Sequence, residues 1–308
     1  MTKLRVAVLS PWCHPWHGYG GLERHVFQLC RSLRREGIEV DLYTSRPWRA
    51  EDPLGSDDGF RLVVVPGVPA LRRRFLVVAT RNVLYPAFSL RMGHRVAAAA
   101  GPRGYAAVIA QGLTAFGVAF RTRSLGIRLP LVLNPQGMEE IVTPNAWKRA
   151  AYLPFRLLET YAARHAEHVV ATDEALVETV EESLAVPAHK IVVIPNAIET
   201  EECLAHVTPE GRRRALESTG AAGASPLLVS VGRLAPNKGF DVALEALAAL
   251  SAELPRSWRW VIAGDGPLRG ALARRAAALG LLPHVVFAGA LSDADLHNLL
   301  SAADLLLH

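Results

Sequence analysis

The feature that most constrains the fold is a regular alternation of short apolar runs with helix-like segments. The first helix-like segment covers about 23–35, and Val26, Leu29 and Leu33 lie on one of its faces. Strands separated by helices predict parallel sheets with right-handed crossovers, and therefore an α/β fold. The strand-like runs cover 4–9, 38–44, 62–65, 106–110, 131–133, 168–171, 191–194, 227–231, 260–263, 285–288 and 305–307.

The length of the chain indicates more than one domain. At 308 residues, about two domains of roughly 150 residues each are expected. The stretch from 196 to about 225 is polar, charged and glycine-rich, so we place the boundary at its start. The sequence thus predicts a Rossmann-like domain over 1–195 and a second over 196–308. A cleft is expected between them, where the strand ends face each other.

The apolar runs and the cysteines bear on the compartment. No apolar run reaches the roughly 18 residues that cross a membrane, and the N-terminus lacks the apolar core of a signal peptide. Cys13, Cys30 and Cys203 are odd in number and irregularly spaced. They indicate neither a disulfide framework nor a zinc site, so a protein of the reducing cytoplasm is expected.

A basic stretch stands out in the first half. Residues 68–100 contain six arginines, interleaved apolar residues and no acid. Such a stretch is suited to an anionic membrane surface or a lipid-linked acceptor. The alternative is an ordinary amphipathic helix with a solvated basic face. We expect contact with the inner face of a membrane through 70–95, and no nucleic-acid partner, because no recognition motif for one is present.

The segment 229–239 has the pattern of a phosphate-binding loop. A buried strand leads into Gly232 and Arg233, and Lys238 opens a helix whose apolar face includes Phe240 and Leu244. A helix N-terminus offers free N–H groups and partial positive charge, and the two cations add full charges. This arrangement predicts a phosphate or diphosphate site. The alternative is that both cations are solvated loop charges.

Two glycine turns follow other predicted strands. Gly20 and Gly21 precede the first helix, where they allow close approach of backbone to a ligand or simply form a tight turn. They do not form a dinucleotide fingerprint, because Glu23 stands where the third glycine belongs. Gly264 and Gly266 flank an aspartate in a second turn, which ordinary turn chemistry also explains.

Six motifs in order resemble one family. The chain is similar to retaining GT-B glycosyltransferases of family 4 (group 1), which use nucleotide-diphosphate sugars. The resemblance implies two tandem Rossmann-like domains facing across a cleft. The motifs are Gly20-Gly21-x-Glu23, Ile194-Pro195-Asn196, Gly232-Arg233-Leu234 with Lys238-Gly239, Gly264-Asp265-Gly266-Pro267, Phe287-x-Gly289 and Ala303-Asp304-Leu305.

The resemblance also implies a role for individual residues. Arg233 and Lys238 would be the catalytic cations that clamp the donor diphosphate and stabilise charge on the leaving nucleotide. The implied reaction is transfer of a hexose, with retention, from a UDP- or GDP-sugar to a glycan or lipid-linked acceptor. It needs no cofactor besides the donor and no metal. Donor contacts are implied for Gly20, Gly21, Gly232, Gly264, Gly266 and Leu291, and acceptor or sugar contacts for His14, Glu23 and Gln136.

The sequence departs from the family pattern in two informative places. Gln136 stands where family members often have a histidine, and an amide forms hydrogen bonds but does not carry a proton near neutral pH. The chain stops near the strand at 305–307, before a glutamate-bearing loop that the family pattern contains, so we expect an incomplete second domain. The alternatives are a non-catalytic, truncated nucleotide-binding fragment, and a sugar-nucleotide epimerase or phosphorylase on the same scaffold.

Overall fold

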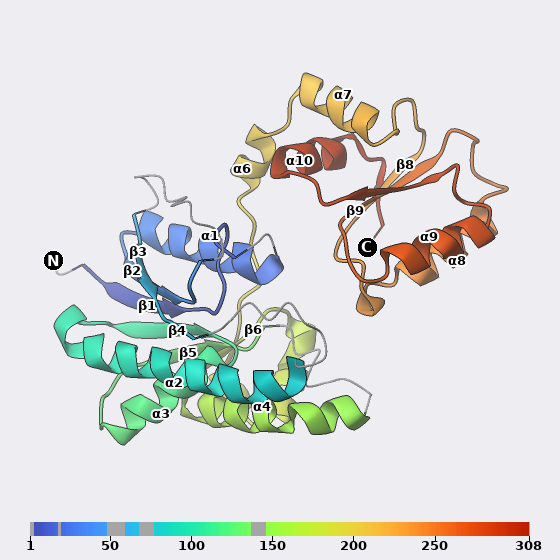
Figure 1. The fold of residues 1–308 in the computed structure, drawn as a ribbon. Coiled ribbons are helices and arrows are strands. Elements are labelled where there is room, and N and C mark those ends of the chain that lie inside the picture. The colour runs from blue at the N-terminus through green and yellow to red at the C-terminus, as the bar shows by residue number, and fades with distance from the viewer. Residues whose placement is uncertain (1–2, 18–19, 48–58, 68–76, 137–145, 308) are drawn as a thin grey trace. The chain divides into compact units, whose positions relative to one another are not determined.

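The chain folds into two compact units. The computed structural model describes residues 3–17, 20–47, 59–67, 77–136 and 146–307, the side chains at 77–83, 146 and 148 excepted. Unit 1 is Met1–Ile198 and unit 2 is Glu199–His308 (Figure 1). The division therefore falls three residues beyond the boundary expected at 195/196. That the two units face each other across a cleft stays a prediction.

Unit 1 contains a seven-stranded parallel sheet in the order β3-β2-β1-β4-β5-β6-β7. The order reverses between β1 and β4, which makes the carboxyl ends of these two strands the topological switch point, the usual ligand-binding place in such sheets. The strands are β1 Arg5–Leu9, β2 Glu39–Thr44, β3 Arg61–Val64, β4 Ala107–Gln111, β5 Leu131–Asn134, β6 His168–Ala171 and β7 Ile191–Val193.

Helices cover both faces of this sheet. Side chains alternate along β1: Val6 and Val8 pack with Val26 of α1, whereas Ala7 and Leu9 belong to the core formed with α2, α3 and α4. Figure 1 shows α1 on one face and these three helices on the other. The helices are α1 Gly21–Arg35, α2 Val77–Arg103, α3 Thr114–Ser124, α4 Ala146–His165 and α5 Val177–Leu184, with short 3-10 turns η2 Glu174–Leu176 and η3 Ala188–Lys190.

Helices α2 and α3 cross with their backbones in direct contact. A Cβ on Gly93 would collide with the backbone of Gly117, and a Cβ on Gly117 would collide with the backbone of Ser89. The Ser89 hydroxyl donates to the carbonyl of Leu113 at 2.7 Å and accepts from the Gly117 N–H at 2.8 Å. Only glycine allows this approach, so the two residues fix how α2 lies on α3.

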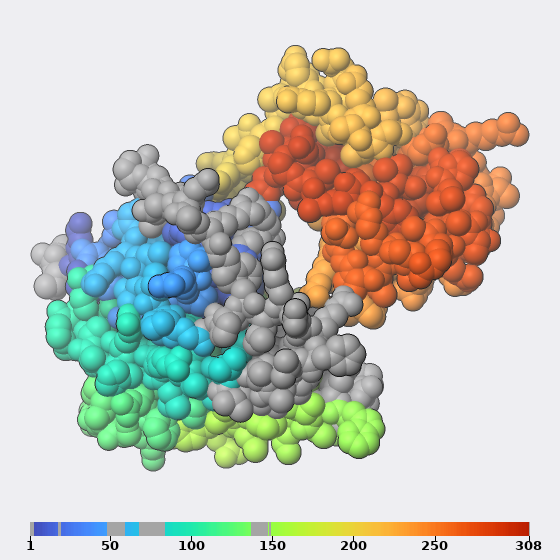
Figure 2. All heavy atoms as spheres, in the orientation of Figure 1, coloured from blue at the N-terminus to red at the C-terminus, as the bar shows by residue number. Residues whose placement is uncertain are grey.

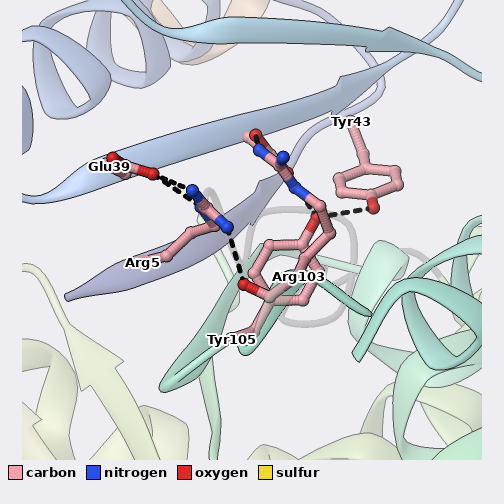
Figure 3. A network of polar contacts seen from close by, with 6 residues as sticks. Arg5, Glu39, Tyr43, Arg103 and Tyr105 are labelled. Atoms are coloured by element: carbon pink, nitrogen blue, oxygen red, sulfur yellow. Dashed lines mark hydrogen bonds and ion pairs between the residues drawn. The ribbon is translucent and has the colours of Figure 1, made fainter. Parts of the chain in front are cut away.

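A buried carboxylate ties α2 to the amino edge of the sheet (Figure 3). Asp41 of β2 is 2 % exposed; it accepts from the Arg103 Nη2 at 2.8 Å and from the Tyr105 hydroxyl at 2.5 Å. Burial by itself raises the pKa of Asp41, but the hydrogen bonds from Arg103 and Tyr105 outweigh it and lower that pKa below its usual value. Tyr43 extends the network through a 2.8 Å contact with the Tyr105 hydroxyl. At the edge, Arg5 binds Glu39.

Unit 2 contains a four-stranded parallel sheet in the order β10-β9-β8-β11. Trp260 and Ile262 of β9 pack with Leu244 of α8, while Val261 packs on the opposite face near Leu299 of α10. The elements are α6 Thr200–Ala205, α7 Pro209–Ser218, β8 Leu227–Val231, η4 Pro236–Lys238, α8 Phe240–Leu250, β9 Arg259–Ala263, α9 Arg269–Ala278, β10 Val285–Gly289, α10 Asp293–Ala302 and β11 Leu305–Leu306.

The expected strands are confirmed, and the helices need small corrections. α1 begins at Gly21 rather than near residue 23, and Gly37 ends it with a φ of +78° and a hydrogen bond to the Arg34 carbonyl. The polar stretch from 196 to about 225, for which no helix was predicted, contains α6 and α7. Within the described residues, no helix combines the length and apolar character needed to span a bilayer.

Candidate functional site

The predicted phosphate loop lies at the switch point of the unit 2 sheet. β8 has β9 on one side and β11 on the other, so the strand order reverses at β8. Gly232 follows β8 directly. Leu234 is fully buried beneath the loop, and Gly239 leads into α8 through a left-handed backbone with a φ of +65°. The loop therefore presents its other residues at the carboxyl edge of the sheet.

Two cationic side chains of this loop have no partner in the described part of the chain. Arg233 and Lys238 are exposed, and neither side chain makes a hydrogen bond or ion pair with the described part of the chain. The first turn of α8 has no side-chain cap, so its N–H groups are available to an anion. Both cations and these donors belong to one nine-residue segment. Whether the two side chains converge on one ligand stays a prediction.

Gly264 and Gly266 support this loop from the neighbouring strand. Gly264 has a φ of +145°, and a Cβ on it would collide with the Gly232 carbonyl. A Cβ on Gly266 would lie 2.7 Å from the nitrogen of Leu234. Both glycines thus allow the 264–266 turn to pack against the 232–234 backbone, and the Leu234 N–H donates to the Asp265 carbonyl at 3.1 Å. Their predicted donor contact remains untested.

Gly232 differs from these two glycines. Its φ is not positive, and the closest atom to a Cβ placed on it is Cζ of Phe240 at 3.7 Å, an ordinary van der Waals distance. Neither backbone strain nor packing in unit 2 therefore requires glycine at this position. Leu291, the remaining donor residue predicted in this unit, is partly buried against the core that Val261 and Leu299 form.

In unit 1, two amides meet at the carboxyl edge of the sheet. Gln111 ends β4 and is 3 % exposed; Gln136 follows β5 with a φ of +49°, a conformation that non-glycine residues rarely adopt. The Gln136 Nε2 donates to Oε1 of Gln111 at 3.2 Å, and its backbone N–H donates to the Asn134 side chain at 3.2 Å. Among the described residues, the Gln111 Nε2 is buried without a hydrogen-bond partner. Sequence reasoning found Gln136 but missed Gln111.

The loop after β1 uses its histidines differently. His14 is half-buried, with its ring 5.5 Å from that of Phe27. His17 is 1 % exposed; its Nδ1 accepts from the Cys13 N–H at 3.1 Å and its Nε2 lies 3.0 Å from the Ser45 hydroxyl. Burial lowers the pKa of His17, so it is a neutral structural residue. The acceptor or sugar contact implied for His14 stays a prediction.

Glu23 lies in the first turn of α1, beside Gly20. A Cβ on Gly20 would collide with the Glu23 carboxylate, whereas a Cβ on Gly21 would meet nothing within 4 Å. Among the described residues, a flexible side chain is what limits the space at Gly20, so these residues leave room for a ligand at this turn. Over the described ranges, no three His, Cys, Asp or Glu side chains lie close enough to share a metal ion.

Comparison with known families decides the affiliation. Residues 20–197 match the model of the glycosyl transferase 4-like domain. The chain belongs to this family. Residues 212–308 match the model of glycosyl transferases group 1. The family of the predicted resemblance is thus confirmed, and the two matches fall in unit 1 and unit 2 respectively.

Individual relatives are distant. A 2-deoxystreptamine glucosyltransferase from Streptomyces kanamyceticus is 27% identical over 192 residues, which are 58% of this chain and 48% of that protein. A GDP-mannose-dependent alpha-(1-6)-phosphatidylinositol monomannoside mannosyltransferase from Mycolicibacterium smegmatis is 34% identical over 101 residues, 33% of this chain and 25% of that protein. The chain spans about half the length of the glucosyltransferase and about a quarter of the length of the mannosyltransferase.

The fold is shared with solved glycosyltransferase-like structures. HepE from Anabaena, solved in complex with UDP and glucose, superposes with a TM-score of 0.69 at 19% identity. The likeness covers 99% of this chain and 74% of that one. It confirms the predicted α/β fold of GT-B type with parallel sheets.

Proposed function

We propose that this chain forms the greater part of a glycosyltransferase that transfers a hexose from a UDP- or GDP-sugar to a glycan or lipid-linked acceptor with retention. Its family supports the transfer reaction. UDP and glucose in the HepE complex, and the GDP-mannose and lipid named for the mycobacterial relative, support the substrate classes. The proposed reaction requires no cofactor besides the donor.

The observation that carries this proposal is the loop from Gly232 to Lys238. The diphosphate of the donor is anionic and gains further negative charge when the bond to the sugar breaks, so cations positioned beside it stabilise both the bound donor and the leaving group. Arg233 and Lys238 are exposed, have no partner among the described residues and precede the uncapped N-terminus of α8 at the switch point. Glycine at 232, which the fold does not require, leaves backbone open to the diphosphate.

Unit 1 supplies the other side of the reaction in this proposal. The amides of Gln111 and Gln136 are suited to hydroxyl groups of the sugar, since each amide offers donors and an acceptor. Neither amide gains or loses a proton near neutral pH, so the proposed step uses no acid–base catalysis by these side chains. His14 and Glu23 take the acceptor side. We place the protein in the cytoplasm, with 70–95 toward the inner face of the membrane.

Calorimetric titration of UDP- and GDP-sugars into the chain tests the donor site. Lys238→Ala and Arg233→Ala are each expected to weaken donor binding about 30-fold, the equivalent of about 2 kcal/mol for a lost charge-assisted contact. Arg256→Ala is the matched control, because Arg256 is an exposed arginine of the same unit that precedes β9, at the amino edge of the sheet. Unchanged donor affinity in both loop variants would contradict the proposal.

The second candidate is a nucleotide-binding module without turnover. The exposed cations Arg233 and Lys238 support it, because they would suit a bound diphosphate whether or not a sugar is transferred. Incubation with a labelled nucleotide sugar and an acceptor mixture distinguishes the two functions. Free nucleotide together with a glycosylated product indicates transfer; bound but intact donor indicates the module. An isomerised nucleotide sugar would instead indicate an epimerase.

A further inference from the structure

A long stretch of unit 1 carries positive charge without acidic residues. From residue 59 to residue 138 the sequence contains no Asp or Glu and eleven arginines. This stretch supplies β3, α2, α3 and the strands β4 and β5. Helix α5, in contrast, carries Glu178, Glu181 and Glu182 and no cation. Because α5 packs in the same core as α2 and α3, the cationic part of this layer is the surface of α2 and α3.

Part of this charge lines a hollow between α2 and α3. The hollow has a volume of about 520 Å³ and is lined by Arg91, His94 and Arg95 of α2, Phe120 and Arg121 of α3, and Pro66 and Leu90. A second hollow of about 500 Å³ shares His94 and Arg95 and continues toward Arg61. Cations at the rim and apolar side chains between them suit an amphiphile with an anionic head group.

The arginines of the first hollow are held in place by the fold. The Arg91 Nη1 donates to the Pro66 carbonyl at 3.3 Å, and the Arg95 Nη1 donates to the Val64 carbonyl at 2.9 Å. The Arg121 Nη2 lies 3.0 Å from Nδ1 of His94. These contacts use some N–H donors and leave the others of each guanidinium for an anion. No carboxylate of the 59–138 stretch competes for them.

Helix α4 adds exposed apolar side chains. Its inward face contains Phe155, Ala162 and Ala163, which are buried. Leu153 and Leu157, one turn apart, project from the opposite side and are exposed, and Trp147 near the start is 87% exposed. α3 packs against both α2 and α4, and Figure 2 shows α3 and α4 (green to yellow-green) at the lower surface of the unit.

We propose that this layer is a membrane-docking face that binds bilayers rich in anionic phospholipid. The face is defined by Arg91, His94, Arg95, Phe120, Arg121, Trp147, Leu153 and Leu157. Lipid phosphates occupy the arginine-lined hollow, and the exposed side chains of α4 enter the interface between head groups and acyl chains. The inference extends the proposed function only in placing the acceptor at the membrane.

Co-sedimentation of the full chain with phosphatidylcholine vesicles, with and without phosphatidylglycerol, tests this docking. No nucleotide sugar is present. We expect binding to the anionic vesicles alone, weakened by salt. The double variant Arg91→Gln/Arg95→Gln should bind about 30-fold more weakly, at about 1 kcal/mol per cation near the surface. Arg212→Gln/Arg214→Gln, which removes two exposed arginines from α7, should bind like the unmodified chain.

A second pair of variants tests the apolar part. Leu153→Ser/Leu157→Ser should weaken vesicle binding, whereas Val242→Ser/Leu282→Ser, at similarly exposed positions of unit 2, should not. Tryptophan emission should shift to shorter wavelength on anionic vesicles, and Trp147→Phe should reduce that shift. Thermal unfolding of each variant shows whether it has folded.

Several results would overturn the proposal: no binding to either vesicle, equal binding to both, or equal loss in the test and control variants. Binding to heparin or duplex DNA without binding to vesicles would assign the face to a soluble polyanion instead. Donor binding, measured separately, should be unchanged in Arg91→Gln/Arg95→Gln. Failure of docking therefore leaves the transferase proposal standing, and failure of donor binding leaves docking standing.

Discussion

The carbonyl of Gly232 occupies the space where a side chain on Gly264 would begin. This contact joins the ends of β8 and β9 and supports the loop that carries Arg233. The two glycines differ, although the sequence alone gives no reason to distinguish them. Packing and a φ of +145° require glycine at 264, whereas neither requires it at 232. Substitutions at the two positions should therefore have different effects.

Gly264→Ala should lower both stability and donor binding. The new Cβ forces the 232–234 backbone to move, and the positive φ at this position strains any residue other than glycine. We therefore expect a loss of about 3 kcal/mol in the free energy of unfolding. Urea denaturation measures it. A variant as stable as the unmodified chain would show that the turn relaxes freely and does not fix the loop.

Gly232→Ala should leave stability unchanged and weaken binding of the donor. The methyl group fits at 3.7 Å from Phe240, but it projects from backbone that we assign to the diphosphate. Calorimetry with the nucleotide sugar and urea denaturation of the same preparation separate the two effects. Normal donor affinity together with normal stability would show that the loop backbone does not approach the ligand.

Gln111→Met should raise stability while impairing transfer. A buried amide nitrogen without a partner costs about 1–3 kcal/mol, and methionine fills a similar volume without that cost. We expect a gain of about 1 kcal/mol in the free energy of unfolding and a lower rate of glycosyl transfer. If stability falls instead, Gln111 is a structural residue whose main contribution is its contact with Gln136.

Asp41→Asn should destabilise the protein in a pH-dependent way. Because Arg103 and Tyr105 lower the pKa of Asp41 in the folded state, its contribution is complete above the unfolded pKa, near 3.8, and is lost as the pH falls through the folded pKa. We expect the variant to lose about 3 kcal/mol at neutral pH. Urea denaturation from pH 7 downward should show the difference shrinking below about pH 4. A difference that does not depend on pH would contradict this assignment.

Gly117→Ala should destabilise unit 1 by about 3 kcal/mol, since the added methyl group collides with the backbone at Ser89. Gly101→Ala, in α2, is the control, because a Cβ there meets nothing within 4 Å and the helix gains propensity. Thermal unfolding of the two variants compares them. Equal melting temperatures would mean that α2 and α3 separate without cost.

Sequence patterns predicted the strands well because each is a short apolar run between turn residues. They missed α6 and α7 because helix formers in 200–218 lie among charges, although Thr208 before Pro209 is a recognisable helix start: the Thr208 hydroxyl accepts from the Gly211 N–H at 3.0 Å. The membrane prediction for 70–95 falls partly on residues outside the described part, since α2 begins at Val77 and its side chains are described from residue 84.

The candidate site was only partly predictable. Motif spacing identified Gly232, Arg233 and Lys238, because a cation pair around a helix start has a local signature. The pairing of Gln111 with Gln136 lacks one, since the residues are 25 positions apart and meet only when β4 and β5 pair. The burial of His17 likewise depends on Ser45 at the end of the neighbouring strand β2.

The hydroxyl of Ser89 connects α2 to the loop that follows β4. It lies on α2, the helix of the proposed docking face, and it donates to the carbonyls of Leu113 and Thr114, just beyond Gln111. Because Gly117 packs against the same turn of α2, α3 and the loop before it lie in direct contact with that helix. A displacement of α2 would therefore disturb the backbone just beyond the end of β4.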